Sequence, residues 1–177
     1  MKDLRSAAPP MLREDDHVRG DPSGELVVFY ADFTCPRCAV AHERLTAAGA
    51  RVVFRHMALR SKDERAVPTA CAAEAAAAQA AFWAFCDALY ADPGHLDDPH
   101  LWERARTLDL DVASFDRDRR GQLAGDRVQR DTRAALAAGA TTTPMLFAAG
   151  IVHPGVPDAD FLARLGYDDP VRIPKTS

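Results

Sequence analysis

The amino-acid sequence predicts an α/β fold in which a strand–helix–strand unit is followed by a long block of helices and then by a hairpin. Three patterns support this prediction. Short apolar runs rich in β-branched and aromatic residues occupy 26–30 and 51–57, helix formers dominate 67–138, and two further apolar runs flank Gly150. A strand–helix–strand unit implies two parallel strands joined by a right-handed crossover.

The first unit begins with the strand at 26–30. Its sequence, LVVFY, is continuously apolar, which is typical of a strand that is buried on both faces. Pro36 suits the first turn of the helix that follows, and we expect that helix to end at Gly49. The second strand covers 51–57, with VVF as its apolar part.

The helical block is expected to contain four helices. Helix formers from 67 to about 91 predict one continuous helix. Asp98 and Asp111 are candidate N-caps for two shorter helices, and a fourth helix is expected over 124–138. The whole block forms an insertion at about 66–139.

Two apolar runs close the fold. Residues 145–148 and 151–153 predict a hairpin, and a last helix is expected over 158–165. We therefore expect one domain over 25–167, and organised structure that begins at Glu25. Residues 1–24 are predicted to be a lead-in that is partly disordered, and residues 168–177 a C-terminal tail.

Charge and composition narrow the functional classes. The 177 residues carry a formal net charge of −4, and acidic and basic residues alternate along most of the chain, so nucleic acid is not an expected partner. Residues 1–20 lack the apolar stretch of a secretory signal, and no segment offers the roughly 20 apolar residues of a membrane span. We expect a cytoplasmic protein without membrane insertion, in which cysteines are usually catalytic or metal-binding.

The chemistry is predicted at Cys35-Pro36-Arg37-Cys38, which follows a buried strand and opens a helix. Unpaired N–H groups and the dipole of a helix N-terminus favour a thiolate over a thiol. Cys35 lies at the cap and is the expected attacking thiol, whereas Cys38 is shielded one turn inside and is the expected resolving thiol. Pro36 and Arg37 are expected to tune the reduction potential of the pair. Because the Arg37 cation would lie beside the sulfur, we expect a more oxidising disulfide than one that encloses Gly-Pro.

Several segments together resemble the DsbA-like thioredoxin domains that occur as soluble bacterial proteins or attached to sodium/proton antiporters. The resemblance covers about 16–165. It is carried by 29–38 as the active-site segment, 54–59 as the second strand, 81–83 in the inserted helices and 143–147 as the cis-proline segment. It implies a thioredoxin-like fold with a helical insertion between the second strand and the cis-proline strand.

The resemblance also implies that Thr143-Pro144 faces the reactive sulfur with a cis peptide bond, because thioredoxin-like sites place a cis-proline there. An extended residue before proline leaves its backbone groups free, so a substrate peptide could pair with Thr143 as an added strand. Thr142 stands where the family often has glycine, and Cys86 stands where it tends to have histidine. Thr142, in place of glycine, is expected to narrow the substrate groove or change its peptide preference.

The function predicted from these residues is thiol-disulfide exchange. Cys35 would attack a disulfide of a protein or a low-molecular-weight thiol, and Cys38 would resolve the mixed disulfide. No cofactor is expected other than the redox-active Cys35–Cys38 disulfide, and a recycling redox partner is implied. The alternatives are a glutathione-type transferase or isomerase on the same scaffold, and a redox-sensing or peptide-binding module without turnover.

Other polar residues receive less specific interpretations. A structural zinc site is not expected, because zinc needs about four ligands and the sequence has no second CxxC. Cys71 and Cys86 would lie about 22 Å apart on one continuous helix, so they are interpreted as buried small side chains. His42 is either a proton relay to the buried thiol or, as we expect, a helix residue that faces solvent. Asp32 is either a turn residue or an acceptor for the Cys38 proton.

Overall fold

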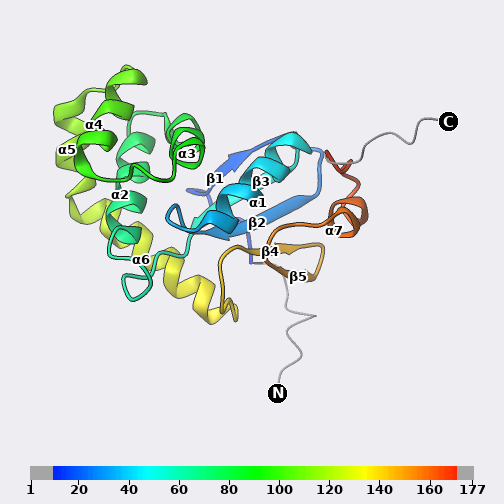
Figure 1. Ribbon diagram of the computed structural model, residues 1–177. Helices are drawn as coiled ribbons and strands as arrows, with labels where there is room; N and C mark the ends of the chain where they lie inside the picture. Colours follow the sequence, from blue (N-terminus) through cyan, green and yellow to red (C-terminus); the bar gives the residue numbers. More distant parts are fainter. Residues whose placement is uncertain (1–9, 171–177) are drawn as a thin grey trace.

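The computed structural model describes residues 10–170, which form a mixed sheet with helices on both faces (Figure 1). The strands are β1 (His17–Arg19), β2 (Leu26–Ala31), β3 (Arg51–His56), β4 (Met145–Ala148) and β5 (Ile151–Pro154). They lie in the order β1-β3-β2-β4-β5. The β2 and β3 strands are parallel and every other neighbouring pair is antiparallel. The expected strand–helix–strand unit therefore forms the centre of the sheet.

Five helices are inserted between β3 and β4. The first four form a lobe beside the sheet, and the fifth, over 122–137, runs from this lobe to one face of the sheet (Figure 1). The helices are α1 (Pro36–Ala47), α2 (Ala66–Ala77), α3 (Phe82–Ala91), α4 (Asp98–Thr107), α5 (Val112–Arg119), α6 (Gln122–Ala137) and α7 (Ala159–Arg164). None of the helices within residues 10–170 is long and apolar enough to cross a membrane.

The continuous apolar run of β2 is explained by burial on both faces of the sheet. Val27 and Phe29 belong to the core cluster that also contains residues of α1, α3 and α7. Val28 and Tyr30 point to the opposite face and pack in a second cluster with Ala135 of α6. Because successive side chains of a strand alternate between faces, a strand covered by helices on both sides needs apolar residues at every position.

The prediction of one continuous helix over 67–91 is wrong, because the chain breaks between α2 and α3. Ala80 adopts a left-handed conformation with φ of 60°, and the Ala81 N–H donates to the Ala76 carbonyl at 2.9 Å. This bond closes the C-terminus of α2 in the manner of a Schellman motif. Tertiary packing overrides alanine's helix propensity, since the break allows Phe82 to stack on the His17 ring at 3.6 Å.

Because the helix is broken, the distance of about 22 Å that was expected between Cys71 and Cys86 on one continuous helix no longer applies. Both thiols are nevertheless buried, and they lie in different core clusters, Cys71 with residues of α2 and α6 and Cys86 with α1 and the sheet. Burial raises the pKa of both thiols. Their interpretation as small buried side chains agrees with these positions.

The ordered fold begins before Glu25, which corrects the expected start. β1 lies within the predicted lead-in and pairs with β3, placing Val18 opposite Val53. This strand has only three residues, and its sequence HVR lacks the apolar run that would have revealed it. Residues 1–9 of the lead-in and 171–177 of the predicted tail lie outside the described residues.

Of the two predicted helix N-caps, one is wrong by one residue and the other is confirmed. The N-cap of α4 is Asp97, not Asp98, because the Asp97 carboxylate accepts a hydrogen bond from the His100 N–H. Asp98 is the first residue of the helix and pairs instead with Arg119. At α5 the expected cap is present, since Asp111 accepts from the Ser114 N–H at 2.6 Å.

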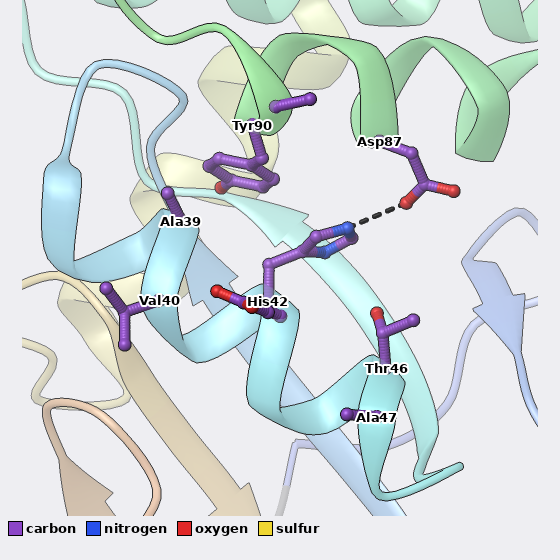
Figure 2. Close-up of a pocket in the computed structure, with 9 residues that line it drawn as sticks. Ala39, Val40, His42, Thr46, Ala47, Asp87 and Tyr90 are labelled. Carbon is purple, nitrogen blue, oxygen red and sulfur yellow. Dashed lines mark hydrogen bonds and ion pairs between the residues drawn. The ribbon is translucent and has the colours of Figure 1, made fainter.

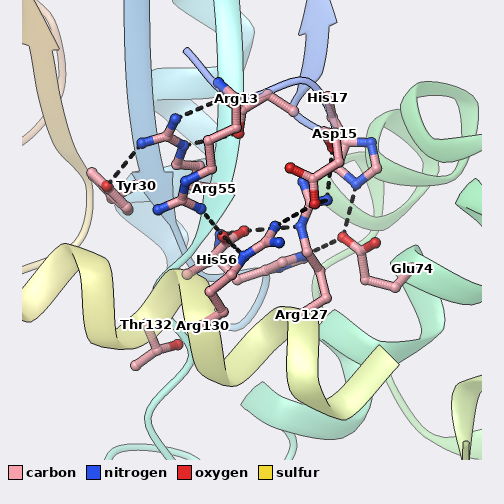
Figure 3. Close-up of polar contacts among 12 residues, drawn as sticks. Arg13, Asp15, His17, Tyr30, Arg55, His56, Glu74, Arg127, Arg130 and Thr132 are labelled. Carbon is pink, nitrogen blue, oxygen red and sulfur yellow. Dashed lines mark hydrogen bonds and ion pairs between the residues drawn. The ribbon is translucent and has the colours of Figure 1, made fainter. Parts of the chain in front are cut away.

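A buried network of charges holds the segment before β1 against β3 and α6 (Figure 3). The Arg55 and Asp16 side chains are 1% and 0% exposed, and they form an ion pair at 2.6 Å. Arg13 pairs with the fully buried Asp131 of α6, also at 2.6 Å. Such pairs offset the cost of burying their charges only while both partners are present. The network therefore makes the early segment a structural part of the domain.

We predict that Asp16→Ala lowers the free energy of unfolding by about 3 kcal/mol, because it leaves the Arg55 guanidinium buried without its carboxylate. Urea unfolding followed by circular dichroism measures the change. Glu103→Ala is the control, since its ion pair with Arg106 is exposed and should contribute less than about 1 kcal/mol. Equal losses in the two variants would contradict the assigned role of the network.

Candidate active site

The two cysteines of the CPRC segment lie where β2 gives way to α1. Cys35 is the N-cap residue of α1 and is half-buried, whereas Cys38 is in the first turn and is fully buried. Pro36 occupies the first helical position, where its missing N–H costs no hydrogen bond. All four cysteines of the chain are free thiols in the structure.

The surroundings of Cys35 stabilise its thiolate and lower its pKa to about 5. The largest cause is a hydrogen bond from the Cys38 thiol, and partial burial opposes it. Hydrogen bonds from the Thr143 side chain and from the backbone N–H groups of Cys38 and Arg37 add to the effect. The two backbone donors belong to the first turn of α1, so part of the shift follows directly from the position of Cys35 at a helix N-terminus.

Cys38 has the opposite character. Burial raises the pKa of its thiol, and the hydrogen bond to Cys35 raises it further. The Asp32 backbone N–H donates to the Cys38 sulfur at 3.5 Å. The site therefore holds one ionised sulfur that reaches the surface and one protonated sulfur beneath it, which is the arrangement that an attacking and a resolving thiol require.

Thr143 and Pro144 lie directly opposite Cys35. The Thr143–Pro144 peptide bond is cis, and the Cys35 sulfur is 3.5 Å from the Thr143 carbonyl oxygen. When Cys35 is a thiol it donates to that carbonyl, and when it is a thiolate it accepts from the Thr143 hydroxyl. β4 begins one residue after Pro144 and pairs with β2, so the sheet itself brings two segments from distant parts of the sequence together.

Arg37 is placed differently from the expectation. Its side chain is exposed and its guanidinium lies over Gly155, which follows β5. The backbone N–H of Arg37 is among the hydrogen-bond donors that lower the pKa of Cys35. The expected tuning of the cysteine pair by the Arg37 charge stays a prediction.

Asp32 acts as a turn residue at the end of β2. Its carboxylate accepts hydrogen bonds from the Thr34 N–H and hydroxyl, both at 2.8 Å, as in an Asx-turn. Burial raises the pKa of this carboxyl, and the two bonds from Thr34 oppose the rise. The Tyr90 hydroxyl donates to the Asp32 carbonyl at 3.4 Å. The turn thus receives support from α3, and the Asp32 carboxylate is engaged by Thr34.

His42 does not face solvent as expected but is buried between α1 and α3 (Figure 2). Its Nε2 lies 2.7 Å from the Asp87 carboxylate, and its ring packs 4.8 Å from that of Tyr90. Burial lowers the pKa of His42 and the Asp87 carboxylate opposes this effect. These residues line a groove of about 600 Å³ beside α1. The histidine joins the helical lobe to the active-site helix.

Three residues of this region had not been singled out from the sequence: Gly155, Tyr90 and Thr34. Thr34 could have been found, because Asp-x-Thr after a strand is a common turn pattern. Tyr90 and Gly155 are 55 and 120 residues from Cys35, and only the folded chain reveals their positions. Among the described residues, no group of three or more His, Cys, Asp or Glu side chains could hold a metal ion.

The sheet order, the helices between β3 and β4 and the cysteine pair at the start of α1 define a thioredoxin-fold protein. The chain belongs to the DSBA-like thioredoxin domain family, whose model matches residues 54–165. The match begins after the CPRC segment, so the family is recognised from the sequence that follows the two cysteines. It confirms the resemblance and the fold class inferred from the sequence.

Among solved structures, a thioredoxin-like oxidoreductase from Silicibacter pomeroyi is similar, with a TM-score of 0.78 and 24% identity over 87% of this chain and 91% of that one. The thiol-disulfide exchange protein alpha-DsbA2 from Wolbachia pipientis has a TM-score of 0.76 and 14% identity over 85% of each chain. Because both sequence identities are below 25%, these two similarities show that the fold is shared.

Curated relatives are larger proteins. The Na(+)/H(+) antiporter NhaA 3 of Salinispora tropica is 39% identical over 155 residues, which are 82% of this chain and 23% of the antiporter. NhaA 1 of Mycolicibacterium vanbaalenii is 35% identical over 88% of this chain and 27% of its own length. The chain thus spans about a quarter of the length of these relatives.

We predict that the rate of Cys35 alkylation by iodoacetamide rises with pH around a midpoint near 5, because the thiolate forms above the lowered pKa. Cys38→Ala removes the largest stabilising hydrogen bond and should move the midpoint upward by about one unit or more. Mass spectrometry measures the rate, and Cys35→Ser reports the background from the three remaining cysteines, Cys38, Cys71 and Cys86. A midpoint near 8.5 in the wild type would contradict the assignment.

Proposed function

We propose that the protein is a thiol-disulfide oxidoreductase that uses Cys35 as its nucleophile and Cys38 as its resolving thiol. The observation that carries this proposal is the pairing of a half-buried sulfur of pKa about 5 with a buried, protonated sulfur one turn away. Membership in the DSBA-like family agrees with the same chemistry. Thr143 and Pro144 are proposed to bind the substrate backbone beside Cys35.

The proposed reaction has two exchange steps. The Cys35 thiolate attacks a substrate disulfide, forming a mixed disulfide and releasing one substrate thiolate. Cys38 then loses its proton to solvent and attacks the Cys35 sulfur, which releases the second substrate thiolate and leaves a Cys35–Cys38 disulfide. The protein loses two electrons and the substrate gains them. The reverse sequence oxidises a substrate dithiol, and a recycling redox partner restores the starting state.

The substrates proposed are disulfides of proteins or of low-molecular-weight thiols. No cofactor is needed for either direction, because the cysteine pair itself carries the two electrons. A glutathione-type transferase or isomerase is a weaker proposal for this site, since such enzymes usually lack the second cysteine and this chain has Cys38. A module that only binds peptides would not need a stabilised thiolate.

We predict that the wild-type protein catalyses the reduction of insulin by dithiothreitol, and that Cys35→Ser reduces the catalysed rate to background. Cys38→Ala should accumulate a mixed disulfide through Cys35, detected by mass spectrometry, because the resolving thiol is absent. Cys86→Ala is the control, since this buried thiol lies outside the pair. Equal activity of wild type and Cys35→Ser would reject the proposal.

The direction of electron flow is decided by the reduction potential of the pair. Thioredoxin lies near −270 mV and strongly oxidising proteins near −120 mV. We expect a potential above that of thioredoxin, because the reduced form gains stability from the Cys35 thiolate at neutral pH. Equilibration with glutathione buffers measures it, and a value below −270 mV would contradict this expectation.

A further inference from the structure

The Arg37 side chain lies at the rim of the active site, against Gly155. It is the second residue of α1, and its side chain is exposed. A Cβ atom built on Gly155 would lie 2.3 Å from Nη2 and 3.4 Å from Cζ of Arg37. The guanidinium therefore lies directly on the backbone of Gly155, in space that the side chain of any other residue would occupy.

The surface under Arg37 belongs to the same loop system as the substrate-binding segment. Gly155 has φ of +95°, a conformation that favours glycine, and it is buried. Its N–H donates to the Pro144 carbonyl at 2.8 Å. Pro144 follows Thr143, whose carbonyl lies 3.5 Å from the Cys35 sulfur. The guanidinium, Thr143 and the reactive sulfur are thus connected through one short chain of contacts.

The charge of Arg37 is not neutralised within the described residues. Its guanidinium makes no hydrogen bond or ion pair there. Asp158, three residues after Gly155, uses its carboxylate to cap α7 by accepting from the Phe161 N–H at 2.8 Å. An oriented cation at the rim remains available to a ligand.

We propose that Arg37 makes the site selective for disulfides that carry a carboxylate close to the reacting sulfur. This inference rests on the proposed exchange activity and names its substrate class. A guanidinium binds carboxylates through two parallel N–H donors, and this one lies against Gly155, whose N–H donates to the Pro144 carbonyl beside Thr143. The contact forms as Cys35 attacks: the Cys35–substrate S–S bond forms, the substrate disulfide breaks, and its electrons leave with the departing thiolate.

The test compares three small disulfides of similar size: anionic 3,3′-dithiodipropionate, neutral 2-hydroxyethyl disulfide and cationic cystamine. Stopped-flow measurement of Cys35 oxidation gives a rate constant for each. The ratio of the anionic to the cationic rate constant is then compared between wild type and Arg37→Gln. We expect the ratio to fall about two- to fivefold in the variant, the size of effect typical of one exposed ion pair, and to fall in the wild type as salt is added.

Three variants separate orientation from net charge. Arg37→Lys keeps the charge but not the planar, two-pronged donor, so it should restore only part of the ratio. Gly155→Ala displaces the guanidinium of Arg37 and also strains the backbone next to Pro144, so it should lower the rates of all three disulfides and reproduce part of the loss in their ratio. Arg106→Gln removes the same charge from α4, at the outer edge of the helical lobe (Figure 1), and should leave the ratio unchanged.

Peptide disulfides with Asp or Lys beside the cysteine extend the test to a second source of carboxylates. A faster reaction with the Asp peptide than with the Lys peptide would identify acidic polypeptides as the substrates. A charge preference seen only with the small disulfides would identify low-molecular-weight acids. If neither set of ratios differs between wild type and Arg37→Gln, the inference is overturned. Cys35-dependent reaction with the neutral disulfide would still support exchange in that case, whereas its absence would reject the proposed function itself.

Discussion

The structure of the site depends on the unequal environments of two sulfur atoms one helical turn apart. Cys35 lies at the open N-terminus of α1, where backbone N–H groups and the Cys38 thiol stabilise a negative charge. Cys38 lies under the same turn, where burial keeps its proton bound. Each sulfur reinforces the state of the other, because the protonated thiol is the principal donor to the thiolate. The proposed order of attack and resolution follows from this asymmetry.

The rest of the fold keeps this turn in place from several directions. The sheet places β4 beside β2, which brings Thr143 against Cys35. The helical lobe contributes the Tyr90 hydroxyl, which supports the carbonyl of Asp32 at the end of β2. Further away, buried ion pairs connect the segment before β1 to β3 and α6 (Figure 3). The inserted helices thus support the strand–helix junction as well as enlarging the domain.

The Arg37 guanidinium shows how a residue of the motif acquires a role that its sequence position does not reveal. Next to Cys35 in the chain, its charge was expected to act on the sulfur. In the fold its side chain lies over Gly155, and the Cys38 thiol, the Thr143 side chain and two backbone N–H groups stabilise the thiolate. The two parts of Arg37 therefore have separate places in the site: its backbone N–H lies in the turn beneath Cys35, and its guanidinium, for which we propose a role in substrate charge preference, lies at the rim.

Local patterns in the sequence were sufficient to predict the strand–helix–strand unit, the hairpin and the placement of Cys35 and Cys38, because a buried strand and a helix start are encoded by neighbouring residues. They were not sufficient for β1, the break before α3, the burial of His42 or the contact between Arg37 and Gly155. Those features depend on contacts between residues far apart in the chain, where packing overrides propensity and a side chain's environment is set by other elements. The sequence by itself determined that Cys35 and Cys38 lie where a buried strand meets a helix, and the tertiary structure decided what surrounds them.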